Sequence, residues 1–400
     1  MLILKRPPYD NFTFRLFFKL TRQIKQPADI FYFWSAIIDP VNKFDFFQNG
    51  QWYHEDELIF REVFLENIKN NLVVIGVKDH LTSDTFNPQK EDCPNLVAYL
   101  IDMFNFYQDK TFILFTSMEN LGCYVKNSNV FIVPWGGDIT NQYDAYPKVE
   151  PVIDKNFDSN TSYISLNRNK RLNRILALST LFGLGLEDYG MLSCMFDKKN
   201  LLTFENDIRL EFQEGSIKDT ISRGLDRINN FDFPVQDDRE IYPKKQNNDN
   251  VFNFETRLKD YYKNTFVEII AETSFTEDAF LITEKTLNSI YGCNFPILIS
   301  SKGAVGFLRN MGIDMFDDIV DHSYDDIVDP IERAYCAIEK NLNLLKNVDS
   351  TKELWAKNKD RFLKNVDFAR IGLYKFYEKR AEAEFDKVIN ILNGGYNNVC

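Results

Sequence analysis

The sequence predicts an α/β fold in two lobes, because short apolar strands alternate with helical stretches in two separate series. The first series runs through residues 71–137, and the second begins at residue 162. Its strands are apolar without a polar alternation, as in parallel sheets that are covered on both faces. Helical periodicity then continues from Thr351 to about Leu392. We therefore expect two parallel sheets, each flanked by helices, and a C-terminal helical segment.

The first thirty residues are basic and aromatic. Two interpretations stay open. The segment is either an amphipathic element whose charged ends reach the solvent, or a basic surface for a polyanionic acceptor. Its cations are Lys5, Arg6, Arg15, Lys19, Arg22 and Lys25, and its interleaved aromatics are Phe12, Phe14, Phe17 and Phe18.

Three strands are expected in the first lobe, at 71–77, 111–117 and 129–137, with a helix at 96–107. Polar residues follow the first two strands directly. Asp79 and His80 come after the first strand, and Glu119 comes after the second. Because ligands of parallel sheets bind at the carboxyl ends of strands, these side chains are candidate acid–base groups. We assign residues 1–150 to this N-terminal, acceptor-binding lobe.

A proline-containing stretch at 141–160 is expected to be a linker. In the second series, strands are expected near 162–167, 266–271 and 296–300, and a helix is expected after each of the first two. Residues 236–250 are expected to form a surface loop. We assign residues 160–345 to a donor-binding lobe. Residues 346–400 are expected to form helices that pack back across the lobes.

A cluster of cations lies at the turn between the strand near 162–167 and the helix that begins near Leu172. Free backbone N–H groups at a helix start favour anions, and added cations strengthen such a site. The sequence therefore predicts a phosphate site here; the alternative is that the cations pair with acids of the other lobe. The candidate residues are Asn167, Arg168, Arg171 and Arg174, with Lys170 beside them.

The segment "FVEIIAETSFTEDAFLITEKTLNSIYGCNFPILIS" predicts strand, loop, helix and strand in succession. Glu272 ends the first strand, Thr283 is placed to cap the helix, and Glu284 and Lys285 open it. A carboxylate at this edge can accept both hydroxyls of a ribose, and a lysine can bind a diphosphate. These four residues are therefore candidates for binding a nucleotide diphosphate carrier.

This segment resembles the donor-binding motif of the α-1,3-fucosyltransferase family. The matching elements, in order, are Glu272-Thr273-Ser274, Asp278, Thr283-Glu284-Lys285, Gly292 and Pro296. Thr273 stands where the family has asparagine, and Phe280 or a neighbour stands where it has tyrosine. The match covers about 30 of the 400 residues. Residues 303–334 are also similar to viral, including phage, and bacterial glycosyltransferase-like proteins.

The resemblance implies the GT-B fold, in which two Rossmann-like lobes enclose a cleft. It also implies that Glu284 holds the nucleotide ribose. Lys285 and one of Arg168, Arg171 or Arg174 would hold the diphosphate, with Glu272 near the sugar. The donor would be a nucleotide-diphosphate sugar of the UDP or GDP type, and the sugar is left open.

The sequence has no Asp-x-Asp element of the kind that metal-dependent GT-A transferases use, and no P-loop or Gly-x-Gly-x-x-Gly fingerprint. We therefore expect no metal and no cofactor. The expected catalytic base is Asp79 or Glu119, with His80 and Asp138 as further candidates at strand ends. A retaining reaction would need no base of this type.

The net charge of −12 opposes non-specific binding of nucleic acid, and the six scattered cysteines fit a reducing cytoplasm. No apolar run is long enough to cross a membrane. The expected function is transfer of a sugar to a surface glycan or to a hydroxymethylated pyrimidine in phage DNA. The expected location is cytoplasmic, in the host if the chain is viral. The alternative is a non-catalytic nucleotide-sugar or glycan-binding protein.

Overall fold

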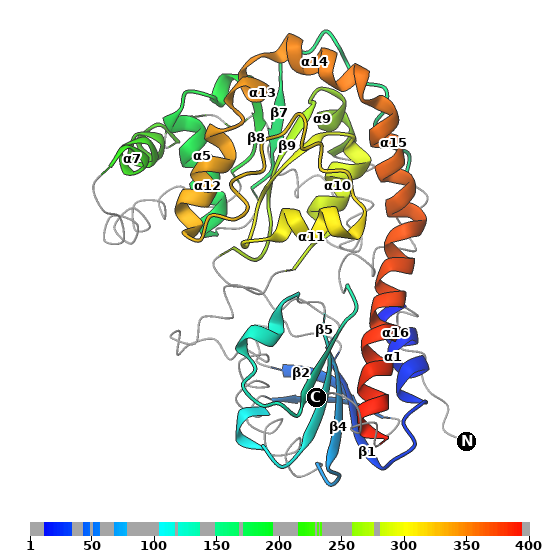
Figure 1. Cartoon of the computed structure of the whole chain (residues 1–400). Coiled ribbons are helices and arrows are strands. Elements are labelled where there is room, and N and C mark those ends of the chain that lie inside the picture. The colour runs from blue at the N-terminus through cyan, green and yellow to red at the C-terminus, as the bar shows by residue number, and fades with distance from the viewer. Residues whose placement is uncertain are drawn as a thin grey trace. The chain divides into compact units, whose positions relative to one another are not determined.

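The structure is a computed structural model of the 400-residue chain, which divides into two compact units (Figure 1). Unit 1 comprises Met1–Asp144, Glu277–Ile282 and Gly372–Cys400, and unit 2 comprises Ala145–Thr276 and Thr283–Ile371. The residues described are 12–33, 43–48, 51–56, 68–77, 104–116, 119–136, 149–167, 171–194, 215–228, 230–231, 233, 258–275 and 281–393.

Each unit contains four parallel strands within the described residues, and this confirms the α/β class. In unit 1 these strands belong to a mixed sheet with the order β3-β2-β1-β4-β5-β6, where β2 runs antiparallel to β1 and β3. The strands are β1 (Ala28–Phe33), β2 (Lys43–Gln48), β3 (Gln51–Asp56), β4 (Leu72–Val77), β5 (Thr111–Thr116) and β6 (Val130–Pro134).

The three strands expected in the first lobe are confirmed as β4, β5 and β6. Strands β1 to β3 were not predicted. Asn49-Gly50 stands between β2 and β3, and it is the residue pair most favoured in two-residue hairpin turns. The helix expected at 96–107 lies mostly outside the described residues, and the loop expected at 236–250 lies wholly outside them.

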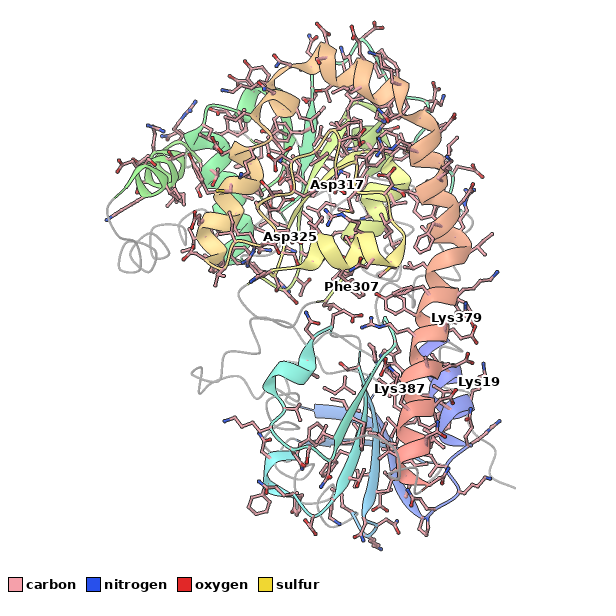
Figure 2. The ribbon with its side chains drawn as sticks, viewed as in Figure 1. Lys19, Phe307, Asp317, Asp325, Lys379 and Lys387 are labelled. Atoms are coloured by element: carbon pink, nitrogen blue, oxygen red, sulfur yellow. The ribbon has the colours of Figure 1, made fainter. Side chains whose placement is uncertain are left out.

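Helix α1 (Phe12–Thr21) is amphipathic, with Leu16, Phe17 and Leu20 buried. The Phe17 ring packs 5.2 Å from the Phe115 ring of β5, measured between centroids. On its polar side, Lys19 pairs with Glu378 and Glu382 of α16 (Leu373–Leu392), so the two helices lie side by side (Figures 1 and 2). In the described part of the N-terminal segment, the amphipathic interpretation therefore holds.

Helix α16 is the last described element of the chain, and it buries one face in unit 1. The buried residues include Tyr377, Ala381 and Phe385, and the Phe385 ring lies 5.7 Å from that of Phe115. Gly136 has a φ of 73°, and a Cβ there would lie 2.5 Å from the Tyr377 ring. Only glycine meets both conditions, so this contact fixes how closely the chain after β6 approaches the helix.

Unit 2 is built on a parallel sheet with the order β10-β9-β7-β8. Its strands are β7 (Tyr163–Ser165), β8 (Gly190–Leu192), β9 (Val267–Ala271) and β10 (Phe295–Ile299). Strands β7, β9 and β10 confirm those expected near 162–167, 266–271 and 296–300, whereas β8 was not predicted. Every residue of β9 and β10 is buried, which explains their apolar sequences.

Helices flank this sheet (Figure 1). They are α5 (Leu172–Gly183), α7 (Ser216–Ile228), α9 (Lys259–Lys263), α10 (Glu284–Gly292), α11 (Ala304–Met311), α12 (Pro330–Glu339), α13 (Leu342–Lys346), α14 (Val348–Lys357) and α15 (Lys359–Asp367). Shorter turns are the 3-10 helices η2 (Leu121–Tyr124, unit 1) and η4 (Glu187–Tyr189) and the π-helical turn η7 (Phe368–Gly372).

Helix α10 ends at Gly292, as the sequence predicted, but Cys293 is the residue with a left-handed φ, of 52°. Gly292 serves a different purpose, because a Cβ at this position would lie 2.2 Å from the Tyr262 ring of α9. The glycine therefore permits close packing of α10 against α9.

Strand β10 is one of the two outer strands of the unit 2 sheet as described, and a segment without strand structure covers it. The Leu298 N–H donates to the Tyr324 hydroxyl at 3.0 Å, and His322 Nε2 donates to the Pro296 carbonyl, also at 3.0 Å. These bonds satisfy backbone groups that an open sheet edge would expose. His322 is thus used in the fold.

Lys155 lies in the stretch expected to be a linker, yet its side chain is buried in unit 2. Its Nζ lies 2.5–2.8 Å from the carbonyl oxygens of Tyr262, Thr265 and Gly292 and from Asn294 Oδ1. Burial lowers the pKa of the Lys155 amine to about 7, while the four oxygens favour its charged form. The lysine thereby attaches the segment after residue 149 to the amino-terminal edge of the sheet.

Replacing Lys155 with Met should lower the free energy of unfolding by at least about 3 kcal/mol, because several buried acceptors lose their donor at roughly 1–3 kcal/mol each. Urea denaturation followed by circular dichroism measures the change. The matched control is Lys263→Met, since Lys263 pairs with Asp260 at the surface and its loss should cost less than about 1 kcal/mol. Equal stability of the two variants would contradict this role for Lys155.

Candidate functional site at the carboxyl edge of the unit 2 sheet

Three helices of unit 2 directly follow strands, so their N-termini lie at the carboxyl edge of the sheet. Asp325 occupies the N-terminus of α11, where its carboxylate accepts the N–H groups of Val305 at 3.2 Å and Gly306 at 2.9 Å (Figure 2). Thr283 caps α10 through its side chain. Helix α5 begins after Arg171 with no side-chain cap and no acid in its first turn. Its start therefore offers the most favourable position for an anion among the three.

Glu272 immediately follows β9, and its side chain is completely buried. One oxygen, Oε1, accepts from the Thr283 N–H at 3.1 Å and from Thr286 Oγ1 at 2.7 Å. The other, Oε2, accepts from Thr283 Oγ1 at 2.6 Å and lies 3.7 Å from Lys285 Nζ. The carboxylate thus binds the start of α10 to the end of β9. A place for Glu272 near a donor sugar stays a prediction.

Thr273 is the point where the two predicted clusters meet. Arg171 donates to its carbonyl at 3.0 Å, and Lys285 Nζ donates to its Oγ1 at 3.3 Å. Asn173 donates to the neighbouring carbonyl of Glu272 at 2.5 Å. The loop after β9 therefore joins the first turns of α5 and α10.

Neither Thr273 nor Asn173 was among the predicted site residues. Their positions in the sequence could have identified them as site residues. Thr273 directly follows Glu272, and Asn173 lies in the first turn of the helix after the basic cluster. Arg333 was also missed. Its buried guanidinium donates to the carbonyls of Phe275 and Ser300 at 2.6 and 2.9 Å, which fixes the loops after β9 and β10. No local pattern marks an arginine for such a role.

Glu284 and Lys285 keep partial exposure at this edge, with 23% and 21% of their side chains accessible. Their charged groups lie 3.7 Å apart, and Lys285 Nζ also donates to Thr283 Oγ1 at 2.9 Å. Both therefore remain within reach of a ligand at the surface, unlike Glu272.

Two of the remaining predicted residues of the basic cluster, Arg174 and Asn167, are described by the structure. Arg174 is buried in the first turn of α5, and Arg168 lies outside the described residues. Asn167 is fully buried, and its Nδ2 donates to the carbonyl of Ser165 at 3.3 Å and to its Oγ at 3.1 Å. Within the described part of the chain, Asn167 Oδ1 accepts no hydrogen bond.

Of the predicted catalytic residues, Glu119 lies in the described part of unit 1. Asp79, His80 and Asp138 do not lie in the described residues. The Glu119 side chain is 2% exposed, and its Oε2 lies 2.6 Å from an NH1 of Arg380 on α16. Burial raises the pKa of Glu119 to about 7, and the positive charge of Arg380 opposes that rise. Sequence reasoning did not find Arg380, because it lies on a helix far along the chain.

The acid-rich segment around residues 314–326 is used within the fold. Asp317 pairs with Arg309, Asp318 pairs with Arg361, and Asp325 caps α11. Across the described ranges, no three His, Cys, Asp or Glu side chains are grouped so that they could hold a metal ion. Within the part of the chain that the structure describes, no helix is long and apolar enough to cross a bilayer.

Chemically, the edge formed by the starts of α5 and α10 combines a helix dipole with the cations of Arg171 and Lys285, which is an arrangement that binds phosphate groups. Comparisons of the chain with protein-family models, with curated proteins and with solved structures gave no match. The geometry of the site is therefore the basis for its interpretation.

Replacing Glu272 with Ala should lower the free energy of unfolding by at least about 3 kcal/mol, because Thr283, Thr286 and Lys285 lose a buried acceptor. Replacing the partly exposed Glu284 with Ala should cost less than about 1 kcal/mol. Chemical denaturation of the two variants measures the difference. A Glu272→Ala protein as stable as Glu284→Ala would show that the carboxylate does not hold this edge together.

Proposed function

We propose that the protein is a GT-B glycosyltransferase that moves a sugar from a nucleotide-diphosphate donor to an acceptor hydroxyl. The observation that carries the proposal is the meeting of Arg171 and Lys285 at Thr273, beside the uncapped start of α5. Two cations and a helix N-terminus together supply the positive charge that a bound diphosphate needs. The same charges would stabilise the diphosphate as it leaves the sugar.

In this proposal, Arg171 and Lys285 bind the diphosphate, and Glu284 binds the ribose hydroxyls. Both Lys285 and Glu284 retain partial exposure, which a ligand-binding role requires. Glu272 acts as a positioning residue, because its buried carboxylate holds Thr283 and Thr286 and thereby sets the direction of α10. Glu119 is the candidate base, and its pKa of about 7 suits proton transfer near neutral pH.

For the acceptor, we favour a glycan or lipid-linked saccharide over DNA. In the described part of the basic N-terminal segment, Phe17 is buried and Lys19 is paired with Glu378 and Glu382, which leaves Arg22 and Lys25 as its other exposed cations. The net charge of −12 would also oppose the approach of DNA.

A thermal-shift screen against UDP, GDP, CDP and dTDP, with a chelator present, tests the donor site. One nucleotide at ~100 times its dissociation constant should add roughly 2.7 kcal/mol of stability to the wild type. Lys285→Ala and Arg171→Ala should lose this shift. Lys263→Ala should keep it, since Lys263 lies before β9, at the opposite edge of the sheet. The proposal would be contradicted if no nucleotide shifts the folded wild type, or if the control loses the shift as well.

A turnover assay tests the chemistry. With the nucleotide identified, the wild type should release the free nucleotide diphosphate from one of its sugar derivatives in the presence of a saccharide acceptor. Lys285→Ala should reduce the rate by ~100-fold or more, because the leaving diphosphate loses a cation. Chromatography of the released nucleotide gives the rate, with Lys263→Ala as the control. Nucleotide binding without release from any sugar donor would instead identify a binding protein.

A further inference from the structure

Unit 1 contains a pocket of about 220 Å3 that lies between the chain after β5 and helix α16. Its lining includes the charged residues Glu119, Arg380 and Glu384 and the apolar residues Leu121, Ile132 and Pro134. Asn120, next to Glu119, has a left-handed φ of 56°, which turns the chain from Glu119 into η2. The pocket therefore brings a buried carboxyl group together with residues from the last helix.

Burial disfavours the ionised form of the Glu119 carboxyl group and so raises its pKa. Neither of its oxygens accepts a well-aligned hydrogen bond from the described residues, and such bonds are what usually stabilise a buried carboxylate. The Arg380 guanidinium, with NH1 at 2.6 Å, is the group that opposes this effect. Arg380 itself is 31% exposed, so its charge is supported by contact with water.

The other ionisable groups around Glu119 do not replace Arg380. Glu384 lines the same pocket but is negative, and it pairs with Lys387 at 2.8 Å (Figure 2). Tyr377 is buried, and burial together with the Glu119 charge raises the pKa of its phenol well above the usual range, so it stays neutral. Among the described residues that line the pocket, Arg380 is the only cation.

We propose that Arg380 is the positioning residue for Glu119, and that its guanidinium, 2.6 Å from the carboxyl, favours the ionised form of Glu119 at the pocket. This inference rests on the proposed function, in which Glu119 removes the proton of the acceptor hydroxyl. In that step the hydroxyl O–H bond breaks and the proton moves to Glu119. The hydroxyl oxygen bonds to the sugar carbon as the sugar–phosphate bond breaks and the nucleotide diphosphate leaves. Glu119 then returns its proton to water.

The direct test is a pH titration of the Glu119 carboxyl by 13C NMR on protein labelled at glutamate, with Glu119→Gln used to assign the signal. In Arg380→Met the midpoint should move to higher pH by at least about one pH unit, because the carboxylate loses its cation. The control is Lys379→Met, which removes the same charge from the neighbouring position of α16 outside the pocket. If Arg380→Met does not fold, Arg380→Ala is the second variant. Its Glu119 titration midpoint should lie at higher pH than in the wild type, and added guanidinium ion should return that midpoint towards the wild-type value.

The second readout is the pH dependence of turnover. The acidic limb of the wild-type profile should follow the Glu119 titration and move to higher pH in Arg380→Met, but not in Lys379→Met. An unchanged midpoint of the Glu119 titration would overturn the proposal even if the protein proves to be a glycosyltransferase. A moved midpoint with an unmoved turnover profile would also overturn it, since Glu119 would not be the base. Failure of the proposed function is seen separately, in the nucleotide screen.

Discussion

The buried carboxylate of Glu272 is the constraint on which the candidate donor site depends. A charged group inside a protein is tolerated only where donors surround it, and the donors here come from Thr283, Thr286 and Lys285. Satisfying the carboxylate therefore forces α10 to begin directly against the end of β9. The same requirement leaves the carbonyl and hydroxyl of Thr273 facing the two cations. The positions of Thr283 and Lys285 in the candidate site thus follow from a buried residue beside them.

The helix starts at this sheet edge also differ in what occupies them. Asp325 fills the start of α11, and Thr283 fills that of α10, so the protein itself satisfies both. The start of α5 has no such occupant among its own side chains. Helix dipoles act over only about one turn, so an anion must lie close to gain from them. Among these three helix starts, that of α5, beside Arg171, is therefore the preferred position for negative charge.

Local pattern predicted the parallel strands β4, β5, β6, β7, β9 and β10 and the helices at 172–183 and 284–292, because buried strands and amphipathic helices leave clear signals. It also identified Thr283 as the cap of α10. Strands β1 to β3 and β8 were missed, although residues 30–33 of β1 form an apolar run and Asn49-Gly50 between β2 and β3 favours a hairpin turn. The partners of Glu119 and Lys155 could not be predicted, because they come from elements far apart in the chain. The burial of Glu272 could not be predicted either, because a carboxylate at a strand end is as consistent with contact to a ligand as with burial inside the fold.

Helix α16 has a consequence for how the protein is made. It belongs to unit 1, although residues 145–276 and 283–371 of unit 2 precede it in the chain. Its residues Tyr377, Ala381 and Phe385 complete the apolar core around Phe115. A ribosome releases the chain at roughly 5–20 residues per second, so the first unit waits tens of seconds for its last helix. During that time a chaperone would need to cover its exposed aromatic surface. A ribosome that stops before residue 373 would leave unit 1 without α16, although unit 2 could already fold.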